Sequence, residues 1–155
     1  LTRDIASPIK SAVAGLEDIV KEYEKKQMEE RVLPFLPVQW RDELRYFTDN
    51  EFASRVMLDG ERMDGVGIER INAEFDADRF SPVDGDVLKV CDNLSAFVEA
   101  CLSCDHGIKS RHLTEGIERL SEKYQPDYSL GGLPFGEIFA DFRKMAEPVL
   151  PTKTH

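Results

Sequence analysis

Residues 84–104 read DGDVLKVCDNLSAFVEACLSC, which is the strongest helical pattern in the chain. Apolar side chains recur every three or four residues, the spacing of one face of an α-helix. They are Val87, Val90, Cys91, Leu94, Phe97, Val98, Cys101 and Leu102. Gly107 then offers a typical helix end. We therefore predict a helix over 84–104 with one face in the core.

A first helix is predicted to start at Ser7-Pro8, an N-cap residue followed by proline at the first helical position. Its apolar face extends to Phe35, and Pro34 and Pro37 end it. The spacing leaves open one long helix or two helices with a bend. The residues of this face are Ile9, Val13, Leu16, Val20, Tyr23, Met28, Val32 and Phe35.

Three further helices are predicted over 38–48, 112–124 and 135–145. Their inward residues are expected to be Trp40, Leu44 and Phe47, then Leu113, Ile117 and Leu120, then Phe135, Ile138, Phe139 and Phe142. Residues 59–83 are glycine-rich and acidic, and we expect a long connection or insertion there, with a weak helix around 68–75. No alternating strand or hairpin pattern is evident. The predicted class is all-α.

The composition indicates a globular chain with an acidic surface. The 155 residues are 41% apolar and carry a net charge of −10, so residues 1–150 are expected to form one domain or part of one, with 151–155 as a tail. The negative charge disfavours a nucleic-acid polymer as partner. No apolar run is long enough for a membrane span. The three cysteines form no disulfide pattern, which favours a cytoplasmic location.

Two short segments carry a family resemblance. Residues 88–94 read LKVCDNL and residues 1–10 read LTRDIASPIK. Together they resemble the second half of an HD-domain metal-dependent phosphohydrolase, in the 5′-deoxynucleotidase-like branch. The resemblance implies a helical HD-like bundle and a catalytic divalent metal ion held by a His, a His-Asp pair and a distant Asp. The chain contains no His-Asp dipeptide, so we expect those ligands, and the N-terminal helices of the bundle, upstream of Leu1.

Asp92 matches the last metal ligand in the family pattern Lys-x-Ala-Asp-x-Leu, with Cys91 in place of the alanine. Lys89, on the same helical face, is expected to neutralise a substrate phosphate. From periodicity alone the simpler interpretation is a solvated face with a Lys89–Asp92 ion pair, because Asp92 lies roughly 80° beyond the apolar stripe.

The resemblance also assigns roles near the N-terminus. Asp4 matches an Asp that positions or activates the attacking water, and Ser7-Pro8 and Lys10 match the run that follows it. Arg3 replaces a small residue of the family and is expected, like Lys10, to contact an anionic substrate. Without the resemblance, Asp4 is an ordinary acidic group ahead of a helix N-terminus.

A zinc site at Cys101, Cys104 and His106 is disfavoured, because a structural site needs four ligands and Cys91 points away from the other two thiols. The leading hypothesis is therefore a phosphohydrolase acting on a small phosphate ester or nucleotide, with this chain carrying part of the site. The alternatives are an HD-like regulatory or protein-interaction domain without ligands, and a plain helical interaction protein. A homodimer is left open.

Overall fold

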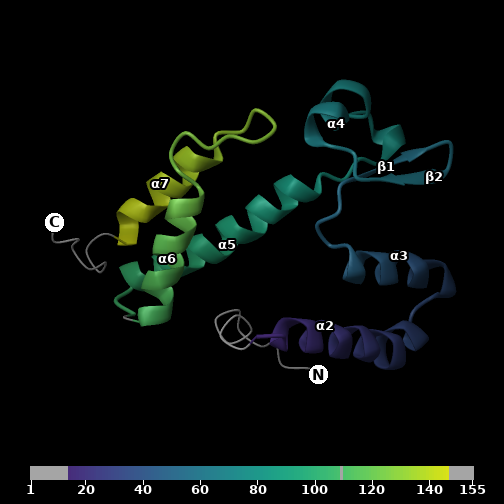
Figure 1. The fold of residues 1–155 in the computed structure, drawn as a ribbon, viewed down its shortest axis with the longest axis horizontal. Coiled ribbons are helices and arrows are strands. Elements are labelled where there is room, and N and C mark those ends of the chain that lie inside the picture. Colours follow the sequence, from purple (N-terminus) through teal and green to yellow (C-terminus); the bar gives the residue numbers. More distant parts are fainter. Residues whose placement is uncertain (1–13, 109, 147–155) are drawn as a thin grey trace. The chain divides into compact units, whose positions relative to one another are not determined.

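The computed structural model describes residues 14–108 and 110–146, which are mostly helical (Figure 1). The chain divides into two compact units, Leu1–Glu51 and Phe52–His155. The predicted all-α class is confirmed, with one short hairpin added. Among the described helices, none combines the length and apolar character that a membrane span requires.

The first unit contains α2 (Leu16–Gln27), which continues through a π-helical turn, η1 (Met28–Val32), and a 3₁₀ turn, η2 (Leu33–Phe35). The described part of this predicted helical region is thus a succession of three helical geometries, and its predicted start at Ser7-Pro8 lies outside the described residues. The 3₁₀ turn includes Pro34, which has no backbone N–H to donate to a continuing helix. α3 (Val38–Asp49) then follows Pro37, close to its predicted bounds.

Polar contacts join α3 to the preceding helical turns. The Arg45 guanidinium makes a two-point contact with the Glu29 carboxylate, one arm of it a 3.1 Å hydrogen bond from Nη2 to Oε2. This hydrogen bonding lowers the pKa of Glu29 and raises that of Arg45. Lys25 Nζ also lies 3.2 Å from Asp49 Oδ1. These two ion pairs link the helical segments of this unit.

Two expected core residues of α3 are instead exposed, Trp40 at 56% and Phe47 at 51%. In the described part of the first unit, only Val20 and Leu33 are buried. Within the first unit, both side chains are therefore uncovered, which departs from the prediction that they point inward. Periodicity identifies an apolar helix face, but it cannot say whether another element covers that face.

The second unit opens with an antiparallel hairpin of β1 (Arg55–Leu58) and β2 (Glu61–Asp64), in which Leu58 pairs with Glu61. Asp59 and Gly60 form its tip with φ of 51° and 83°. Positive φ at both central residues is what a tight hairpin turn requires, and Asp-Gly is a favoured pair for it. The prediction that the chain lacks a hairpin was wrong.

The segment 59–83 also contains more structure than expected. After β2 come α4 (Ile68–Glu74), which confirms the weak helix, and a 3₁₀ turn, η3 (Asp78–Phe80). A small buried cluster anchors the segment, formed by Val56, Val66, Ile71 and Phe75. The segment is therefore structured and has its own apolar cluster, rather than being a bare connection.

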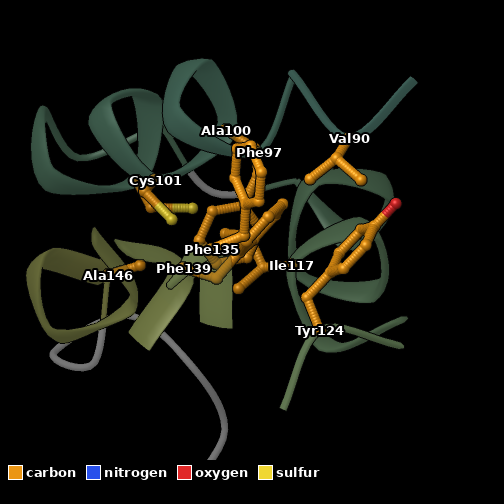
Figure 2. Packing of buried hydrophobic residues seen from close by; sticks show 10 residues of the cluster. Val90, Phe97, Ala100, Cys101, Ile117, Tyr124, Phe135, Phe139 and Ala146 are labelled. Carbon is orange, nitrogen blue, oxygen red and sulfur yellow. The ribbon is translucent and has the colours of Figure 1, made fainter. Parts of the chain in front are cut away.

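The main core lies among α5 (Gly85–Asp105), α6 (Arg111–Lys123) and α7 (Phe135–Ala146). Figure 1 shows these three helices, and Figure 2 shows the buried side chains between them. The Phe97 and Phe139 rings lie 4.9 Å apart, and the Tyr124 ring stacks on Phe139 at 4.4 Å. Most of the predicted stripe of α5 contributes to this core. Cys91 and Leu102 are exceptions: both are exposed, and Cys104 is buried with Cys101 instead.

Candidate functional site

The candidate site is built on the N-terminal half of α5. Asp84 caps this helix, because its carboxylate accepts a 3.0 Å hydrogen bond from the Val87 backbone N–H. At the next position, a Cβ on Gly85 would lie only 2.0 Å from the Phe52 carbonyl oxygen. Glycine is therefore required there for residues 52–54 to approach the start of α5.

Asp92 lies on the solvent side of α5, with 56% of its side chain exposed. This position agrees with the prediction that Asp92 falls outside the apolar stripe. Its Oδ2 atom lies 3.1 Å from Lys89 Nζ, one turn earlier on the helix. The ion pair expected from the sequence is therefore present, in a setting that solvent screens.

Lys89 has a second partner that the sequence did not reveal. Its Nζ lies 4.1 Å from the centre of the Phe52 ring, within the range of a cation–π interaction. Phe52 is distant in sequence and belongs to no periodic pattern that includes α5. No local signal in the sequence identifies this contact.

The residue after Asp92 makes a polar contact that agrees with the orientation set by the buried apolar stripe of α5. The Asn93 side-chain amide donates a 2.7 Å hydrogen bond to the Tyr124 hydroxyl at the end of α6. Tyr124 is itself buried at 3% exposure. With Asn93 turned toward α6, the neighbouring Asp92 is directed to solvent.

One side chain at this site, Asp92, is suited to bind a divalent cation. The Asp92 carboxylate offers a hard oxygen donor of the kind that such ions prefer. Within 14–108 and 110–146, however, no three or more His, Cys, Asp or Glu side chains gather into a metal-binding group. Asp92 therefore fits a single position in a coordination shell, and the described residues do not make a complete site.

The Cys101 and Cys104 thiols belong to the main core rather than to a site. Both have 0% exposure. Burial, assisted by the neighbouring Cys104, raises the pKa of Cys101 from 9.0 to about 11. A protonated buried thiol is a poor metal ligand, because zinc binds the thiolate. The core role predicted for Cys101 is confirmed.

The other predicted site residues lie outside the described part of the chain. These are Arg3, Asp4 and Lys10, which precede α2 in the sequence. Of the predicted set, the structure thus places Lys89 and Asp92, and it brings these two together.

Comparison with known proteins identifies one family. A family model described as an HD domain matches residues 1–121, which include every predicted site residue. Neither a curated protein nor a solved structure matches the chain.

Proposed function

The chain belongs to the HD domain family, and from this premise we propose that it serves as a metal-dependent phosphohydrolase on a phosphate monoester. HD domains are commonly metal-dependent hydrolases. The observation that carries the proposal is the exposed Asp92 carboxylate beside Lys89, within the residues that match the family. An accessible carboxylate with an adjacent cation suits a site that handles a metal ion and an anion together.

Each predicted residue has a distinct task in this proposal. Asp92 contributes one ligand to a divalent ion, which when bound polarises the phosphate and activates water. Lys89 binds the phosphate oxygens and offsets their charge. Asp4 orients the attacking water and accepts its proton. Arg3 and Lys10 contact the anionic substrate.

We propose a nucleoside monophosphate as the substrate class. The support is the segment containing Asp4, Ser7-Pro8 and Lys10, which resembles the 5′-deoxynucleotidase-like branch. A cytoplasmic location, expected from the unpaired cysteines, would give access to such substrates.

A second candidate is a non-catalytic regulatory HD-like domain. The observation in its favour is the same Lys89–Asp92 ion pair, because Lys89 already supplies the Asp92 carboxylate with a positive partner. In that case the pair contributes a few tenths of a kcal/mol to helix stability and has no part in catalysis.

Phosphate release from nucleoside monophosphates distinguishes these functions. The experiment requires the full gene product, which includes any residues encoded before Leu1, assayed with Mg²⁺, Mn²⁺ or Co²⁺ and after chelation. We expect metal-dependent release that Asp92→Asn abolishes. Asp86→Asn is the matched control, because Asp86 is another exposed aspartate of α5. Equal activity in parent and Asp92→Asn would contradict the proposal.

A further inference from the structure

Phe52 is fixed to the start of α5 by its backbone and by its neighbours. The Gly85 backbone N–H donates a 3.0 Å hydrogen bond to Ser54 Oγ. Arg55 and Val83 exchange two backbone hydrogen bonds of 2.8 Å each. Together with the close approach of the Phe52 carbonyl to Gly85, these contacts hold residues 52–55 against the residues that lead into α5.

This arrangement gives Lys89 two independent partners. Its ammonium lies 3.1 Å from Asp92 Oδ2 and 4.1 Å from the centre of the Phe52 ring. Asp92 is on the same helix, whereas the ring comes from the anchored segment. The Lys89 side chain is 45% exposed, so an anion from solvent can approach it.

We propose that Phe52 is a positioning residue for Lys89, its ring face holding the ammonium beside Asp92 where the phosphate of the substrate binds. The inference rests on the proposed function and adds to it a residue outside the family motif. A long lysine side chain pays conformational entropy to adopt one position. The ring reduces this loss on substrate binding, because Lys89 is already held near the place where it acts.

The placement of Lys89 is tested by NMR of its ε-methylene protons in the full gene product. Protons over an aromatic face resonate upfield of those in freely exposed lysines, and Lys89→Gln assigns the signal. We expect this upfield position in the parent and in Asp92→Asn, because the ring holds Lys89 without the carboxylate. In Phe52→Leu the signal should move to the position of exposed lysines.

Two further variants make this test specific. Phe52→Tyr preserves the aromatic face and should preserve the upfield signal. Phe80→Leu removes a different ring, whose partners are Arg79 and Phe75, and should also leave it unchanged. The placement would be overturned if the Lys89 ε-methylene protons of the parent had the chemical shift of exposed lysines. It would also be overturned if their upfield shift were unchanged in Phe52→Leu. Loss of the upfield signal in Phe52→Tyr would overturn it as well.

Kinetics then test the role in substrate binding. Cation–π contacts at exposed sites correspond to roughly 2- to 5-fold in affinity, so Phe52→Leu should raise KM for a nucleoside monophosphate by about that factor with little change in kcat. Phe52→Tyr and Phe80→Leu should retain the parental KM. An unchanged KM in Phe52→Leu, while Lys89→Gln raises it, would overturn the positioning role. A parent without hydrolytic activity would overturn the proposed function, and the NMR result would still decide the placement.

Discussion

The Asn93 amide and the Tyr124 hydroxyl form a 2.7 Å hydrogen bond that joins α5 to the end of α6. Asn93 follows Asp92 in sequence, about 100° further around the helix, and its amide is part-buried against Tyr124. The Tyr124 ring is stacked on Phe139 of α7. Tyr124 thus contacts α5 through its hydroxyl, at the residue after Asp92 of the candidate site, and α7 through its ring.

Tyr124→Phe should lower the free energy of unfolding by about 1 kcal/mol, because it removes the hydroxyl and leaves the part-buried Asn93 amide without its partner. Urea unfolding measures this difference. Tyr128→Phe is the matched control, since Tyr128 packs edge-on against Tyr124 and should show a much smaller change. Equal losses in the two variants would argue against a specific role for the hydrogen bond.

The buried Cys101 thiol should make the free energy of unfolding depend on pH in the alkaline range. Its pKa rises from 9.0 to about 11 through burial, so the folded protein retains a proton that the unfolded chain releases. The stabilising contribution is therefore complete below about pH 9 and is lost as pH rises toward about 11. Urea unfolding near pH 8 and near pH 10.5 should show a larger alkaline loss in the parent than in Cys101→Ala. A difference in the free energy of unfolding between parent and Cys101→Ala that is the same at both pH values would contradict this role of Cys101.

Asp4→Asn should reduce turnover of the full gene product by roughly 10²-fold or more, because it removes the carboxylate that handles the proton of water. Metal content should stay close to that of the parent, since Asp4 is proposed to act on water rather than on the ion. Turnover and metal content, measured on the same protein samples, distinguish a role in water activation from a role in metal binding. Equal rates in the variant and the parent would rule out the assignment.

The helices of the main core could be predicted from the sequence because their apolar residues are local and periodic. Phe97, Ile117 and Phe139 were all expected inside, and all are buried. The exposed apolar face of α3 shows the limit of this reasoning. Trp40 follows the helical repeat, yet what covers such a face depends on tertiary contacts that a periodic pattern does not contain.

The hairpin was missed for a different reason. Its strands are short and carry charges, so they lack clear alternation, although the Asp59-Gly60 turn was itself a recognisable signal. At the candidate site, the exposed position of Asp92 and its pairing with Lys89 follow from helical geometry. The Phe52 contact could not be predicted, because it depends on how residues 52–55 pair with the segment before α5.

The most direct test of the proposed phosphohydrolase is the metal content of the full gene product after gel filtration. We predict a fixed stoichiometry of divalent metal in the parent and in Asp86→Ala, and its loss in Asp92→Ala, because one missing ligand leaves the coordination shell incomplete. Circular dichroism should show that all three proteins retain their helices. Unchanged metal stoichiometry in a folded Asp92→Ala protein would contradict the account.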